Sequence, residues 1–270
     1  MPGALTTEVH GPVATVWLDR PEARNAMGPD FWDDLPLEMA RVSGDLAVRA
    51  VVVAARGDHF SVGLDLKAMG GTLAGGTGHS PAARAAAVRA TVVRMQAAVT
   101  SVAACPKPVV AAVQGYCLGA GVDLVTACDV RLASADAVFS VRETRMAMVA
   151  DLGSLQRLPR IVGAGHVAEL ALTGRDVPAT RAREIGLVND VLGDHDAAVA
   201  AARAMAEEIA ALSPLAVQGT KAVLTAGDGR TVSEGLDYVA AWNAGMLVSD
   251  DLVEALAAFS EKRPPRFEGR

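Results

Sequence analysis

Residues 108–159 read PVVAAVQGYCLGAGVDLVTACDVRLASADAVFSVRETRMAMVADLGSLQRLP, and this stretch decides the fold. An apolar run at residues 109–113 predicts a strand, and a segment with three glycines follows it at residues 115–121. A helical pattern begins at Val122, and a second short β-type run covers residues 137–141. The stretch therefore predicts a strand, a glycine-rich turn, a helix and another strand, which is the alternation of an α/β protein.

The same alternation continues toward the N-terminus. Residues 48–55 (VRAVVVAA) form a continuous apolar run rich in valine, which is typical of a strand buried on both faces. Residues 13–18 predict another strand, and residues 81–102 fit a long amphipathic helix. Between them, the glycine- and threonine-rich residues 70–78 predict a loop.

The C-terminal part has a different character. From residue 197 the pattern is helical, interrupted by a Ser-Pro break. With 270 residues, the chain suits one large domain or a domain with a smaller appendage. We therefore predict an α/β layered core over residues 1–196 and a helical region over residues 197–270.

Composition and charge argue against several classes of partner. The net charge of −6 does not favour a nucleic-acid partner, which needs a basic face. No apolar run approaches the roughly 20 residues that cross a bilayer, and no signal peptide is evident, so we expect a cytoplasmic protein without a membrane partner. Cys105, Cys117 and Cys128 lack metal-ligand spacing and are expected to be buried free thiols. The five histidines are scattered, so we expect no metal site.

Three acids lie in otherwise apolar surroundings: Asp123, Glu143 and Asp151. A carboxylate in such a place is costly unless it is paired, hydrogen-bonded or protonated. Together they suggest proton-transfer chemistry in a dry pocket. Each also has a plain structural explanation. Asp123 could complement a helix dipole, Asp151 could cap a helix, and Glu143 could pair with Arg142 or Arg145.

Two glycine loops offer backbone amides. Residues 61–66 (SVGLDL) follow a buried strand, and residues 118–121 (LGAG) precede a helix. One amide from each loop could stabilise a carbonyl oxygen that becomes negatively charged during a reaction. Ordinary turns are the alternative for both loops. The sequence contains neither G-x-G-x-x-G at the 115–121 turn, nor a P-loop, nor G-x-S-x-G, which argues against nucleotide and Ser-hydrolase sites.

The two loop segments resemble a known family. HFSVGLDLKAM (residues 59–69) and QGYCLGAGVDLVTACDVRLAS (residues 114–134) are similar to the two oxyanion-hole segments of the crotonase (enoyl-CoA hydratase/isomerase) superfamily. The resemblance extends from residue 18 to residue 267. It implies a crotonase-like spiral of ββα turns, with a C-terminal helical region used in trimer formation. Homotrimers or hexamers would follow.

The resemblance also implies a set of site residues. An acyl-CoA would be the substrate, with no cofactor beyond the coenzyme A that the substrate itself carries. Ala120 stands where glycine is more usual, but its amide is retained. By matching positions, Leu64 and Ala120 would supply the oxyanion-hole amides. The residues that would contact CoA are Val62, Gly63, Asp65 and Lys67. Phe259 and Lys262 resemble residues that reach a CoA bound to a neighbouring subunit.

Within the superfamily, the acids look like those of the Δ3,5-Δ2,4-dienoyl-CoA isomerases. By that resemblance, Asp151 would take a proton from C2, Glu143 would deliver one at C6, and Asp123 would influence the protonation of Glu143. The alternative is a 2-enoyl-CoA hydratase that activates water with Asp123 and Glu143. A third possibility, a CoA-binding member without catalysis, is disfavoured by the intact acids.

Overall fold

The computed structural model describes residues 3–73 and 80–270. A six-stranded sheet lies at its centre, in the strand order β1-β2-β3-β4-β6-β9. Strand β1 is antiparallel to β2, and the other neighbours are parallel. The strands are β1 (Leu5–His10), β2 (Val13–Leu18), β3 (Ala50–Ala55), β4 (Val109–Val113), β6 (Val130–Ser134) and β9 (Asp190–Leu192). A smaller sheet contains β5 (Tyr116–Leu118), β7 (Val138–Ser140) and β8 (Val177–Pro178).

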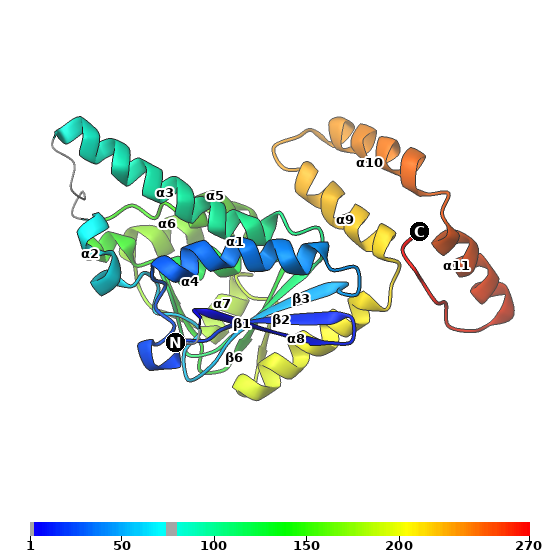
Figure 1. Cartoon of the computed structure of the whole chain (residues 1–270), viewed down its shortest axis with the longest axis horizontal. Coiled ribbons are helices and arrows are strands. Elements are labelled where there is room, and N and C mark those ends of the chain that lie inside the picture. Colours follow the sequence, from blue (N-terminus) through cyan, green and yellow to red (C-terminus); the bar gives the residue numbers. More distant parts are fainter. Residues whose placement is uncertain (1–2, 74–79) are drawn as a thin grey trace.

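Helices cover both faces of the large sheet (Figure 1). On one face, α1 (Pro29–Gly44) and α3 (Pro81–Ala103) pack on Val51 and Val53 of β3. On the other face, α8 (His195–Ala210) packs its alanines against Ala50 and Val52. Because successive strand residues point to opposite faces, the apolar run in β3 supplies both cores.

The remaining helices are short or C-terminal. In chain order they are the 3₁₀ turn η1 (Pro21–Ala23), α2 (Leu66–Leu73), α4 (Ala120–Thr126), the 3₁₀ turn η2 (Glu143–Met146), α5 (Ser154–Ile161), α6 (Ala164–Thr173), α7 (Ala179–Glu184), α9 (Pro214–Ala226), α10 (Val232–Met246) and α11 (Asp250–Glu261).

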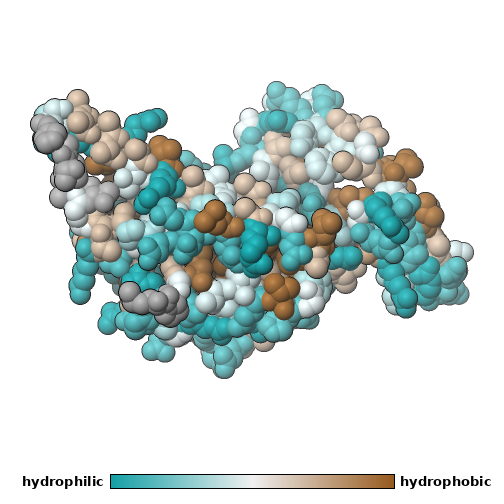
Figure 2. Space-filling view, viewed as in Figure 1, coloured by the Kyte–Doolittle hydropathy of each residue, from teal (hydrophilic) through white to brown (hydrophobic). Residues whose placement is uncertain are grey.

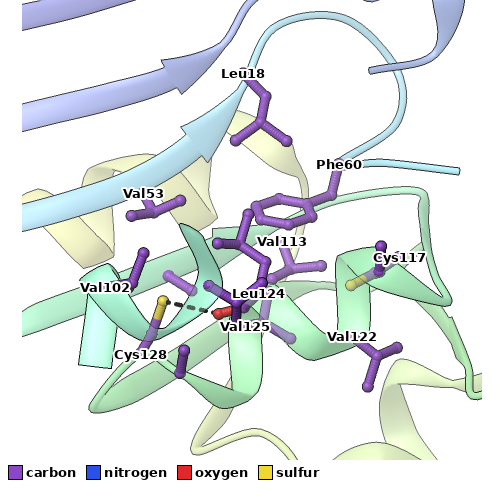
Figure 3. Packing of buried hydrophobic residues seen from close by; sticks show 14 of the residues in the cluster. Leu18, Val53, Phe60, Val102, Val113, Cys117, Val122, Leu124, Val125 and Cys128 are labelled. Carbon is purple, nitrogen blue, oxygen red and sulfur yellow. Dashed lines mark hydrogen bonds between the residues drawn. The ribbon is translucent and has the colours of Figure 1, made fainter. Parts of the chain in front are cut away.

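Helix α4 is anchored in the core. In Figure 3 Phe60 and Val113 lie beside Leu124, with Leu18 on the other side of the Phe60 ring, and all four side chains are fully or almost fully buried. Burying a side chain of this size stabilises the fold by about 1.5–3 kcal/mol. This packing holds the start of α4, and with it the second glycine loop, at the end of β4.

Helices α9, α10 and α11 extend away from the core (Figure 1). A buried contact ties α9 to the core, because the Lys221 ammonium lies 2.6 Å from the Asp129 carboxylate and 3.0 Å from the Lys107 carbonyl oxygen. The predicted boundary at residues 196 and 197 falls inside α8, whose alanine face belongs to the core. The packing places the change from core to projecting helices after Ala210.

The predicted loop at residues 70–78 is partly helical, because α2 continues to Leu73. Its start is stabilised by Asp65, whose carboxylate accepts a hydrogen bond from the Ala68 amide at 3.1 Å. Residues 74–79 of that prediction lie outside the described residues.

In the described ranges, no single helix is long and apolar enough to cross a membrane. Helices α8 and α9 meet such criteria only as a pair, and this pair is bent by 110°.

Candidate active site

The two glycine loops lie directly against each other. Gly63 has a φ of +87°, and a Cβ atom there would lie 2.7 Å from the Leu118 carbonyl oxygen and 3.4 Å from the Ala120 nitrogen. Glycine is therefore required at this position both by its backbone conformation and by the close approach of the second loop. This contact brings together two segments that are more than 50 positions apart in the sequence.

The amides of Leu64 and Ala120 stand out within these loops. The neighbouring amides are used, since Asp65 donates to the Met27 carbonyl at 3.0 Å and Gly119 donates to the Ser140 carbonyl at 2.9 Å. Among the residues that the structure describes, the amides of Leu64 and Ala120 have no backbone acceptor in these turns. Ala120 is also the first residue of α4, where a helix leaves its amides unpaired.

Both residues line one cleft with a volume of about 980 Å³. One wall comes from α3 through Val88, Val92 and Met95, and another from the segment that carries Met148 and Val149. The lining is therefore mostly apolar, with a few polar groups. Such a cleft suits an apolar chain that carries one polarised carbonyl group.

Glu143 reaches the cleft from the start of η2. Its Oε1 atom would lie 3.2 Å from a Cβ atom at Gly119, and its buried Oε2 atom has no hydrogen-bond partner in the described part of the chain. Burial, followed by the negative charges of Asp123 and Asp151, raises the pKa of Glu143 to about 7.

The alternative partners of Glu143 are engaged elsewhere. Arg142 lies 2.5 Å from Asp176, and Arg145 lies 3.5 Å from the Thr173 carbonyl oxygen. Glu143 is therefore a buried carboxyl group whose ordinary state near neutral pH is divided between protonated and ionised.

Asp151 also lines the cleft and is exposed to it. Partial burial raises the pKa of its carboxyl group. The Gln96 side chain of α3 donates a hydrogen bond of 2.6 Å to the Asp151 carbonyl oxygen. Asp151 does not cap α5, because the N-cap residue of that helix is Gly153. The capping explanation of Asp151 is thus excluded.

Asp123 occupies a different place from the other two acids. It is 1% exposed and is not among the residues that line the cleft. Its Oδ1 atom accepts a hydrogen bond of 2.6 Å from the amide of Ser154, the first residue of α5. Burial raises the pKa of Asp123 to about 6, against the lowering effects of Ser154 and Arg157. Asp123 is therefore more deeply buried than Glu143 and Asp151, and its negative charge acts on Glu143 beside the cleft.

The expected CoA-binding residues divide into two groups. Val62 and Gly63 line the cleft, whereas Lys67 is exposed outside it. Asp65 caps α2 and lies 3.5 Å from Arg20, so its carboxylate is already engaged.

Phe259 and Lys262 lie far from the cleft within the same chain. They sit at the end of α11, beyond the core (Figure 1), and Phe259 is 86% exposed. Their contact with the CoA of a neighbouring subunit stays a prediction.

The structure adds cleft residues that sequence reasoning missed. Arg24, Tyr116, Arg142 and Asp176 line the cleft but carry no distinctive sequence signal. Tyr116 stacks on His59, with ring centroids 4.6 Å apart. Within residues 3–73 and 80–270, no group of three or more His, Cys, Asp or Glu side chains could hold a metal ion.

Comparisons with known proteins agree with this architecture. The family described as enoyl-CoA hydratase/isomerase matches residues 8–270. The chain is 30% identical to an enoyl-CoA hydratase from Bacillus anthracis, with a TM-score of 0.90 over 99% of this chain and 100% of the other. A putative enoyl-CoA hydratase from Streptomyces coelicolor A3(2) is 35% identical, with a TM-score of 0.89 over 99% and 94% of the two chains.

Sequence relatives have more specific names. A peroxisomal Δ(3,5)-Δ(2,4)-dienoyl-CoA isomerase from Arabidopsis thaliana is 43% identical over 93% of this chain and 90% of its own length. A mitochondrial protein of the same activity from Homo sapiens is 42% identical over 93% and 77%. These names contradict the expectation of a cytoplasmic location, because these relatives are described as peroxisomal or mitochondrial.

Proposed function

Because this chain is an enzyme that belongs to the enoyl-CoA hydratase/isomerase family, we propose that it converts a 3,5-dienoyl-CoA into a 2,4-dienoyl-CoA. The observation that carries this proposal is the presence of two carboxyl groups, Asp151 and Glu143, in one apolar cleft. They lie beside two amides that have no backbone acceptor among the described residues. Relatives named for this activity, at about 42% identity over most of the chain, support the same assignment.

The proposed reaction moves a proton from C2 to C6, across four carbon–carbon bonds. Asp151 removes a proton from C2, and the electron pair of that C–H bond moves into the conjugated system. The double bonds shift from C3–C4 and C5–C6 to C2–C3 and C4–C5, and Glu143 delivers a proton to C6. The intermediate carries negative charge on the thioester oxygen. The amides of Leu64 and Ala120 stabilise this charge, and one such donor contributes about 3–4 kcal/mol.

The protonation states suit these roles. A base must be ionised and an acid protonated at the same pH. The pKa of Glu143 is about 7, so a large share of this group still carries a proton near neutrality. Asp151 is more exposed, and partial burial raises the pKa of its carboxyl group. No cofactor is needed beyond the coenzyme A of the substrate, because the chemistry moves only protons.

A 2-enoyl-CoA hydratase is the second candidate, favoured by the likeness to hydratase structures. That reaction requires Asp123 and Glu143 to hold one water molecule. Asp123 is 1% exposed and its carboxylate already accepts the Ser154 amide, which makes this role less suitable. A spectroscopic assay on 3,5-dienoyl-CoA and on 2-enoyl-CoA separates the two. The double bonds become conjugated with the thioester in the first reaction, and conjugation with the thioester is lost in the second.

The pH dependence of the reaction should follow Glu143. Since its pKa is about 7, kcat/KM is expected to fall as the pH rises above about 7 and the acid loses its proton. In Asp123→Asn the neighbouring negative charge is removed, so ionisation of Glu143 becomes easier and its pKa decreases. The alkaline limb of the kcat/KM profile should therefore move to lower pH. An unmoved limb, or a shift to higher pH, contradicts this coupling.

We also propose that the chain assembles as a homotrimer or hexamer through its C-terminal helices. Helices α9, α10 and α11 expose apolar side chains, and Figure 2 shows apolar patches among hydrophilic surface in this part of the molecule. Leu224, Leu236 and Leu256 are between 62% and 75% exposed. Light scattering should therefore give at least three times the chain mass of 27.7 kDa. A monomer mass at micromolar concentration refutes this arrangement.

A further inference from the structure

The turn at residues 150–153, which carries Asp151, is held at three points. Gln96 of α3 donates to the Asp151 carbonyl oxygen at 2.6 Å. Arg157 of α5 donates to the Leu152 carbonyl oxygen at 3.2 Å. Asp123 of α4 accepts from the Ser154 amide at 2.6 Å, directly after the turn. Three different helices therefore fix the backbone around the proposed base.

Arg157 occupies the centre of this arrangement. Its second terminal nitrogen lies 3.4 Å from the Thr100 hydroxyl group on α3, so one guanidinium joins α3, α5 and the turn. The guanidinium fills the space that a side chain at Gly153 would need, since a Cβ atom there would lie 2.9 Å from its Cζ atom. Gly153 also has a φ of +121°, which favours glycine. The conformation of the turn therefore depends on glycine at position 153 and leaves room for the Arg157 guanidinium beside it.

Arg157 is not among the residues that line the cleft. It is half-buried, and burial lowers the pKa of its guanidinium while the negative charge of Asp123 raises it. Its positive charge lowers the pKa of Asp123 against the effect of burial. Its geometry and its charge both act on groups next to the cleft, not on the substrate.

We propose that Arg157 is a positioning residue that holds the turn at residues 150–153 so that the Asp151 carboxylate faces the acyl chain. This inference rests on the proposed function of Asp151 as the base. A base that is displaced by about 1 Å can cost about 10²-fold in rate, because general-base catalysis depends on a near-attack geometry. The loss of Arg157 should therefore reduce kcat and leave substrate binding nearly intact.

The test compares Arg157→Met with Arg160→Met, a matched loss of one arginine from the same helix. Arg160 pairs with Asp228 on the surface, away from the turn. On 3,5-dienoyl-CoA, Arg157→Met should lower kcat by about 10²-fold with little change in KM, whereas Arg160→Met should stay close to the wild type. Arg157→Lys keeps the charge but cannot bridge the Leu152 carbonyl and Thr100 in the same way. Its kcat should therefore lie between those of the wild type and Arg157→Met.

A double variant separates positioning from a general loss of structure. If Arg157 acts through Asp151, then adding Arg157→Met to Asp151→Asn should lower kcat by a much smaller factor than Arg157→Met does in the wild type. The proposal is overturned if Arg157→Met lowers kcat by the same factor in the wild type and in Asp151→Asn. It is also overturned if Arg157→Met has wild-type activity. If Arg157→Met does not fold, the Lys variant carries the same comparison.

Hydrogen exchange of the turn gives a readout that does not depend on the reaction. Amides around residues 150–154 should exchange faster in Arg157→Met, or in the Lys variant, than in Arg160→Met. If the wild-type protein does not isomerise the dienoyl substrate, the proposed function fails, and exchange alone then decides the positioning role. Unchanged exchange refutes that role.

Discussion

Asp151→Asn is expected to lower the rate of 3,5-dienoyl-CoA isomerisation by about 10²–10⁴-fold, the range for loss of a positioned acid–base group. The change is nearly isosteric. It leaves the hydrogen bond from Gln96 intact, because that bond ends on the backbone oxygen. The fold and the affinity for CoA should therefore be preserved, and the loss should appear in kcat.

The control for this variant is a second acid from the same cleft. Asp176 also lines the cleft, but its carboxylate is paired with Arg142 at 2.5 Å. Asp176→Asn should consequently reduce the isomerisation rate far less. Any hydration of 2-enoyl-CoA should also fall less in Asp151→Asn, since that chemistry would rest on Glu143 and Asp123. Full isomerase activity in Asp151→Asn excludes Asp151 as the base, and the proton at C2 must then be removed by another group.

Gly63→Ala is expected to have the second largest effect, about 10²–10³-fold in kcat, the range for loss of one oxyanion-hole donor. The new methyl group would lie 2.7 Å from the Leu118 carbonyl oxygen, and φ is +87° at this position. The two loops must therefore move apart, which changes the spacing of the Leu64 and Ala120 amides. The left-handed backbone also costs a non-glycine residue about 1–2 kcal/mol of stability.

Gly70→Ala is the matched control for Gly63→Ala. Gly70 lies in α2, a few residues further along the same segment, and a Cβ atom there meets no other atom within 4 Å. In a helix, alanine is more stable than glycine by about 0.5–1 kcal/mol, so this variant should keep its activity and fold at least as well. Steady-state kinetics and urea unfolding of both variants give the comparison. Equal activity of the two variants contradicts an oxyanion hole between these loops.

Much of the fold was readable from local sequence patterns. The apolar run of β3 predicted a strand buried on both faces, and both faces are indeed covered. The helix predicted at residues 81–102 corresponds to α3. Errors concerned boundaries, such as the loop expected from residue 70, where the Asp65 cap lets α2 continue through two glycines. Local propensity disfavours glycine in a helix but does not decide where a capped helix ends.

The candidate site was identified only in outline. Leu64, Ala120, Glu143 and Asp151 all line one cleft, and each was singled out from the sequence. Asp123 was grouped with them because it also lies in an apolar segment. A helical pattern predicts that a residue is buried but not which groups its side chain contacts. Its actual partner, the Ser154 amide, is 31 positions away in the sequence.

The sequence by itself determined the strands, the glycine loops, the acids and the family, because these depend on local composition and on short motifs. Only the tertiary structure decided which of these groups meet. The Gln96 contact to Asp151 spans 55 positions, and the Arg157 contact to Thr100 spans 57. Contacts over such separations depend on how α3, α4 and α5 pack around the common core. No periodicity or spacing within a single segment records that packing.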